Sequence, residues 1–199
     1  MRVRTVIGVV VLGVLLVAPG SARAQNRSGG WVGFGGGVGS AGLTCDDCDS
    51  TDRETGGVVY VNAGVTMSPK LLLGAEFNLW SKTYKDADFG GEAKVNFYNL
   101  LATATVYPSS GGFFVKGGAG VAFFDTDIKE SGLSLTLDMG KGLGVIGGAG
   151  IDVPMGRIVI TPAVNYWYAS TGDLKYQGEA FLTGMKHNVL AVTVGVKWP

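Results

Sequence analysis

Two cysteines separated by two residues form the most reactive pair of side chains in the chain. Cys45 and Cys48 stand in the acidic segment Cys45-Asp-Asp-Cys48, which Asp52 and Glu54 follow. In an exported protein such a pair favours a local disulfide that stiffens a loop. A redox site and a metal site, the latter completed by aspartates or by His187, are the alternatives. We expect neither a bound metal nor a cofactor.

Glu76 and Lys116 are the second candidate pair. Each falls on the polar side of a segment whose other side is apolar. If these segments are strands that cross a membrane, the two charges lie inside the structure and need partners. We expect a structural ion pair that fills the interior, and the alternative is a gate on a narrow conduction path.

Catalytic chemistry finds little support in the chain. His187 is the only histidine, and no serine or carboxylate stands near it at the spacing of a hydrolytic triad. We therefore expect no catalytic residue and no enzyme activity.

The alternation of side chains in the last segment, residues 188–198, indicates that strands position the candidate residues. Successive side chains of a strand point to opposite faces, and here one face is wholly apolar: Leu190, Val192, Val194, Val196 and Trp198. The opposite face holds small, quiet residues: Val189, Ala191, Thr193 and Gly195. One apolar face opposite a small or polar one is typical of a transmembrane β-barrel strand.

The same alternation recurs along the chain. It predicts strands at Trp31–Ser40, Val58–Met67, Leu71–Ser81, Ala93–Tyr107, Phe113–Phe124, Lys141–Val153, Arg157–Ala169 and Asn188–Trp198. Such lengths match the ~9–11 residues that a tilted membrane strand requires. We predict an all-β fold, an eight-stranded antiparallel up-and-down transmembrane β-barrel.

The connections between these strands alternate in length. The short ones each contain proline and cover residues 68–70, 108–112 and 154–156. The long ones cover residues 41–57, 82–92, 125–140 and 170–187, and hold 14 acidic and 6 basic residues, a net charge of −8. Long acidic connections indicate solvated extracellular loops first, and a cation-binding or receptor surface second.

Aromatic residues gather near both ends of the predicted strands. We expect them to form interfacial belts: Trp80, Tyr84, Tyr166, Trp167 and Tyr168 near the long connections, and Phe113 and Trp198 near the short ones.

The N-terminus has the pattern of an export signal. Basic residues and an apolar run within residues 2–18 precede Ala22-Arg-Ala24, so we expect a signal peptide over residues 1–24 and a single barrel domain over residues 25–199. A membrane anchor helix is the rival interpretation, but it needs ~20 apolar residues. Without the signal the chain has 13 basic and 16 acidic residues, a net charge of −3, which argues against nucleic acid as a partner.

Together these patterns resemble the small outer-membrane β-barrel proteins, the group that contains the outer membrane protein A and X barrels. The resemblance runs from Gly30 to Trp198, and implies insertion into the outer membrane of a Gram-negative cell. It also implies two partners, the membrane lipid and the barrel assembly machinery, which reads the last strand as its signal. Strands of this kind normally end on Phe or Trp, whereas Pro199 follows Trp198 here.

The leading functional hypothesis is a non-enzymatic outer-membrane barrel with a structural or surface-interaction role through its acidic loops. Some barrels of the resembling group modify lipid A, so a lipid A-modifying enzyme is the runner-up. A soluble periplasmic ligand binder, similar to lipocalins, is the third.

Overall fold

The computed structural model describes residues 28–46, 52–85, 91–130, 133–176 and 179–198, and for residues 128–130, 133–139, 173–176 and 179–183 it describes the backbone alone. The expected signal peptide over residues 1–24 and Cys48 lie outside these residues, so cleavage after Ala24 stays a prediction. No helix among the described residues has the length and apolarity to cross a membrane.

The described residues form nine strands. They are β1 (Gly30–Thr44), β2 (Glu54–Ser68), β3 (Leu71–Lys85), β4 (Glu92–Val106), β5 (Phe113–Glu130), β6 (Leu133–Ile151), β7 (Val153–Met155), β8 (Ile158–Tyr176) and β9 (Glu179–Trp198). β7 is three residues long, and only Asp152 separates it from β6. It therefore continues β6, and the sheet has eight long strands.

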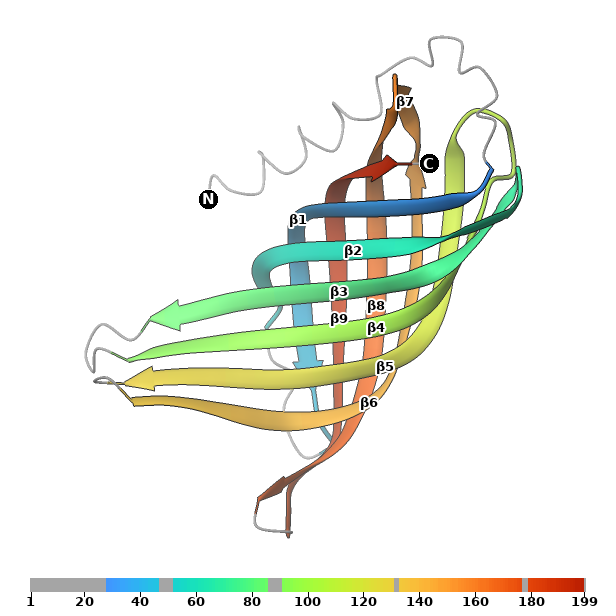
Figure 1. The fold of residues 1–199 in the computed structure, drawn as a ribbon. Coiled ribbons are helices and arrows are strands. Elements are labelled where there is room, and N and C mark those ends of the chain that lie inside the picture. Colours follow the sequence, from blue (N-terminus) through green and yellow to red (C-terminus); the bar gives the residue numbers. More distant parts are fainter. Residues whose placement is uncertain (1–27, 47–51, 86–90, 131–132, 177–178, 199) are drawn as a thin grey trace.

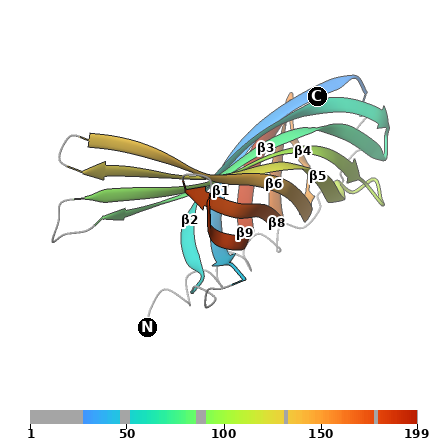
Figure 2. The same cartoon turned by 90° about the horizontal axis from the view of Figure 1, so that it is seen from below.

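The sheet closes on itself. Each strand from β1 to β5 pairs antiparallel with the next one along the chain. The ring is completed by the pairs β1–β9, β9–β8 and β8–β6. Closure leaves no sheet edge in the membrane-spanning part, which is what backbone groups in lipid require. The prediction of an eight-stranded antiparallel barrel is confirmed. β3 to β6 lean away from β8 and β9 at one end of the barrel (Figure 1, and Figure 2 from below).

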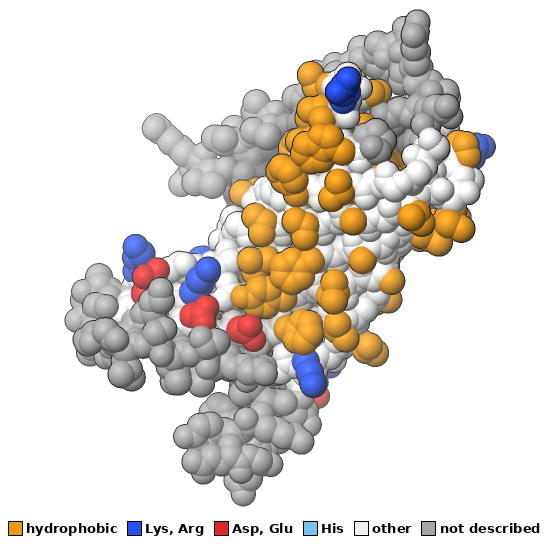
Figure 3. All heavy atoms as spheres, viewed as in Figure 1, with side chains coloured by type: hydrophobic (Ala, Val, Ile, Leu, Met, Phe, Trp, Pro, Cys, Tyr) orange, Lys and Arg blue, Asp and Glu red, His pale blue; other side chains and the backbone are white. Residues whose placement is uncertain are grey.

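Side chains alternate between lipid-facing and lumen-facing positions as the sequence predicts. In β9, Leu190, Val192 and Val194 are exposed, whereas Ala191 and Thr193 between them are buried. Figure 3 shows the exposed hydrophobic side chains spread over the barrel wall, with charged side chains towards its ends. A soluble barrel would bury its apolar row inside, so this surface faces lipid.

Two of the four predicted long loops, over residues 125–140 and 170–187, are wrong, because most of each segment is paired strand. Within residues 125–140 the β5–β6 ladder continues to Glu130↔Leu133, and within residues 170–187 the β8–β9 ladder continues to Tyr176↔Glu179. The charges in these segments suggested loops, but Leu133, Leu135 and Leu137 alternate with polar residues there, as in a strand.

One short connection is also displaced. Residues 154–156 were expected to be a turn, but Pro154 and Met155 belong to β7 and pair with β8. The chain reverses at Gly156, whose φ of 68° is in the left-handed region that favours glycine.

Glycines in β1 and β9 leave room for one large side chain. A Cβ atom at Gly195 would lie 1.9 Å from the Tyr60 hydroxyl oxygen, and one at Gly35 would lie 2.7 Å from the Tyr60 ring. The inward glycines therefore make the space that a narrow barrel needs for an inward tyrosine.

Candidate functional site: the closed lumen

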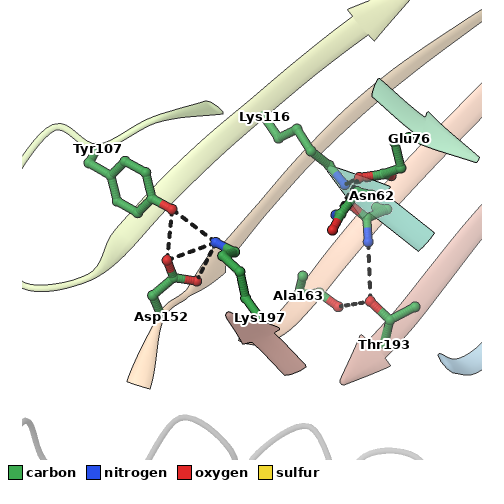
Figure 4. A network of polar contacts seen from close by, with 9 residues as sticks. Asn62, Glu76, Tyr107, Lys116, Asp152, Ala163, Thr193 and Lys197 are labelled. Carbon is green, nitrogen blue, oxygen red and sulfur yellow. Dashed lines mark hydrogen bonds and ion pairs between the residues drawn. The ribbon is translucent and has the colours of Figure 1, made fainter. Parts of the chain in front are cut away.

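The middle of the lumen holds the ion pair between Glu76 and Lys116. Glu76 lies on β3 and Lys116 on β5, the two neighbours of β4, and the Lys116 Nζ is 2.7 Å from each carboxylate oxygen. The Asn62 amide donates a further hydrogen bond of 3.1 Å to Glu76 (Figure 4). Glu76 is only 1 % exposed. Since two donor groups give the carboxylate three hydrogen bonds, the pair is a fully formed contact.

A second ionic cluster closes the end of the lumen at the short turns. The Lys197 Nζ lies 2.9 and 3.1 Å from the two carboxylate oxygens of Asp152. Asp152 also accepts hydrogen bonds from the hydroxyls of Tyr107 (2.7 Å) and Thr161 (3.0 Å). Tyr107 follows β4 and Lys197 is on β9, which is the strand opposite β4 in the closed order. The cluster thus spans the lumen (Figure 4).

Aromatic rings surround the Lys197 ammonium. The rings of Trp31 and Phe114 have their centroids 5.7 and 5.6 Å from the Nζ. A cation over such ring faces is attracted to them electrostatically. Sequence reasoning missed this cluster, because it treated the inward row of the last strand as quiet and did not pair Lys197 with Asp152.

A small polar cavity lies between the two ionic layers. Its volume is about 30 Å³, room for about two water molecules. Among the described residues, no hydrogen-bond partner meets the Asn62 Oδ1, Asn165 Oδ1 or Trp31 Nε1 atoms, which belong to residues of the cavity wall. The cavity therefore has the room and the polar groups to hold water, and is too small for a solute channel.

The other half of the lumen is filled by apolar side chains. We call this cluster the plug: Ala41, Cys45, Val58, Trp80, Phe97, Leu101, Phe124, Ile146, Trp167, Met185, Val189 and Ala191. Phe97 stacks on Trp80 with ring centroids 5.0 Å apart, and Trp80 is held by a hydrogen bond of 2.9 Å from its Nε1 to the Gly39 carbonyl. Close-packed aromatic rings leave no open path through this half.

The plug corrects part of the predicted aromatic belt. Trp80 and Trp167 are each 1 % exposed and point into the lumen. They share the inward rows of Asn78 and Asn165, so strand alternation, not residue type, decides where they lie. Tyr84, Tyr166, Tyr168, Phe113 and Trp198 are exposed, as the belt requires.

His187 also lies inside the barrel. It was one possible ligand of a metal site with the cysteines, but its side chain is fully buried beside the plug. Cys45 is a buried member of the plug, and Cys48 is outside the described residues, so the Cys45–Cys48 disulfide stays a prediction. Among the described residues, no group of three or more potential metal ligands comes together.

Ion pairs lie at the rim on the side of the long hairpins, beyond the apolar outward row. Lys82 bonds to Glu54, and Lys186 bonds to Asp46 at 3.0 Å. These hydrogen bonds raise the pKa of both lysines. Arg53 donates to the Ser40 hydroxyl and carbonyl and to the Asn188 side chain, which ties the segment before β2 to β1 and β9.

Solved structures of small outer-membrane barrels are similar to this fold. Neisserial surface protein A superimposes with a TM-score of 0.57 at 14 % identity, over 87 % of this chain and 99 % of that one. Ail, the attachment invasion locus protein of Yersinia pestis, crystallised with the heparin analogue sucrose octasulfate, has a TM-score of 0.55 at 12 % identity, over 85 % and 99 %. No family model and no curated protein matches the chain. The chain therefore has the fold of the small eight-stranded outer-membrane β-barrels.

Proposed function

We propose that this chain is a non-enzymatic outer-membrane protein that presents acidic β-hairpins at the cell surface. One observation carries the proposal: two hairpins continue far beyond the apolar band. β5 runs on from the lipid-facing Phe123 to Glu130, a rise of about 23 Å at the usual spacing of strand residues. A barrel that only anchors itself needs no such extension, and rigid hairpins are suited to binding a partner.

Charge indicates the class of partner. The four segments around the hairpin ends have a net charge of −8. The crystallised Ail complex contains a sulfated polyanion, which this acidic surface would repel. We propose a cationic partner, such as a basic peptide or a basic protein surface.

Three alternatives lose support. A soluble lipocalin-like binder would need its apolar row inside. A lipid A-modifying enzyme would need an accessible catalytic group, and the only histidine, His187, is buried in the lumen. Opening the Glu76–Lys116 pair alone would not make a channel, since the plug blocks the other half.

The location is tested by a peptide tag inserted between Glu130 and Leu133. Antibody should label the tag on intact cells, and the protein should fractionate with the outer membrane and migrate differently with and without heating. A water-soluble protein, or a tag that is reached only after lysis, would contradict the proposal.

The partner class is tested with a fluorescent oligolysine and with heparin on the same cells. Oligolysine should bind and be released by salt, because the attraction is between exposed charges. Replacing Asp86, Asp88 and Glu92 by their amides should weaken binding. The matched control is Arg157→Gln, a charge change at the opposite end of the barrel. Preference for heparin would overturn the assignment.

A further inference from the structure

A stack of three rings crosses the lumen at the plug. Phe97 lies between Trp80 and His187, and its ring is nearly parallel to both, with interplanar angles of 17° and 8°. The Phe97–His187 centroid distance is 4.3 Å. Phe97 is on β4 and His187 on β9, which are opposite strands of the closed order. Their contact therefore holds the two walls of the extracellular half together.

His187 has no polar partner in this place. Its side chain is 0 % exposed, and neither the Nδ1 nor the Nε2 atom meets a hydrogen-bond partner in the described part of the chain. Trp80 at the other end of the stack differs, since its Nε1 donates to the Gly39 carbonyl. The histidine thus occupies an apolar position that fits only its neutral form.

The groups around His187 offer no counter-charge. The residues opposite it in register are Leu43 on β1 and Ala169 on β8. The ionisable side chains nearest along the inward rows are Glu54 on β2 and Lys82 on β3, and these are already paired with each other at the rim. Other described side chains on the surrounding inward rows are apolar or neutral: Ala41, Cys45, Met185 and Val189, with Trp167 and Thr171 on β8.

We propose that His187 is an acid-sensitive latch of the plug. When the imidazole takes up a proton, the cation has no partner in the apolar cluster and must move to water. The stack with Phe97 then breaks and the extracellular half of the lumen opens. Histidine is the side chain whose ordinary titration lies closest to neutral pH, and burial without a counter-charge lowers the pKa of His187, so the latch responds to stronger acid.

The test follows the exposure of the plug tryptophans. A variant with Trp31→Phe and Trp198→Phe leaves Trp80 and Trp167 as the only tryptophans. In this background, refolded in lipid vesicles, we expect acrylamide quenching to rise about twofold between about pH 7 and about pH 4. Adding His187→Phe keeps a ring in the stack without a titratable proton, and should abolish the rise. His187→Gln, which is polar and does not titrate, should also respond no longer to pH.

Carboxylates provide the competing explanation, because Glu76 and Asp152 are buried in the other layers of the lumen. A quenching rise that persists in both His187 variants would assign the acid response to them and overturn the proposal. So would quenching that stays constant with pH in the parent. If His187→Phe fails to fold, the Gln variant alone decides.

Discussion

The two halves of the lumen are filled from the same eight strands but with different chemistry. The plug packs aromatic and aliphatic side chains, and Trp80, Phe97 and His187 meet face to face. The half near the short turns pairs Glu76 with Lys116 and Asp152 with Lys197 around a small polar cavity. An apolar layer depends on shape, whereas a buried ionic layer depends on complete pairing. The two halves should therefore fail in different ways.

Removing one charged partner from the ionic half should lower the free energy of unfolding more than any other change described below. Asp152→Ala would leave the Lys197 ammonium buried and without its carboxylate, which costs about 3–5 kcal/mol of unfolding free energy. Urea unfolding in lipid vesicles measures this loss. Combining Asp152→Ala with Lys197→Met removes both charges and should recover most of it. A single variant as stable as the parent would show that the cluster is not paired.

Removing a ring from the plug tests the apolar half. Phe97→Ala should cost about 3 kcal/mol, because it opens a cavity between Trp80 and His187. Leu100→Ala on the same strand is the matched control, since Leu100 is 50 % exposed towards lipid and lipid chains can fill the space. Equal losses in the two variants would argue against a packed plug.

The Glu76–Lys116 ion pair tests whether the ionic half depends on complete pairing of its charges. Glu76→Leu combined with Lys116→Met should stay within about 1 kcal/mol of the parent, while each single change costs more. A double-mutant cycle by the same unfolding measurement separates the pair from its surroundings. If the double variant is the least stable of the set, the pair contributes net stability in its own right.

Breaking an exposed ion pair at the rim should change the stability of the barrel least. The hydrogen bond to Glu54 raises the pKa of Lys82, so the contribution of the pair is complete below the ordinary lysine pKa and lost as pH rises through the raised value. Lys82→Met should therefore shift the unfolding midpoint slightly at neutral pH, and the difference should vanish in strong alkali. A difference that grows with pH would contradict this sign.

The sequence predicted the outer surface better than the interior. Alternation alone identifies lipid-facing rows, because each apolar residue such as Val61 or Leu100 needs only its own strand to be placed. It could also have placed Trp80 inside, since Glu76 and Asn78 share its row. The strand ends of β5, β6, β8 and β9 were missed because their charged residues indicated loops, although Leu133, Leu135 and Leu137 alternate with polar residues in β6.

Contacts across the lumen could not be predicted from the sequence. Whether Lys197 meets Tyr107, or His187 meets Phe97, depends on how far neighbouring strands are staggered when the barrel closes. No local pattern encodes that stagger. Glu76 and Lys116 were easier, because they lie on strands separated by a single strand.

The cluster at Lys197 also has a consequence for the timing of assembly. Lys197 stands 90 positions after Tyr107, and its strand is the last to be made. Until β9 docks onto β8, where Lys197 lies opposite Val159, the Asp152 carboxylate has no ammonium beside it. Adding the last strand therefore also neutralises a buried charge. A barrel that lacks this strand keeps that carboxylate without its counter-charge.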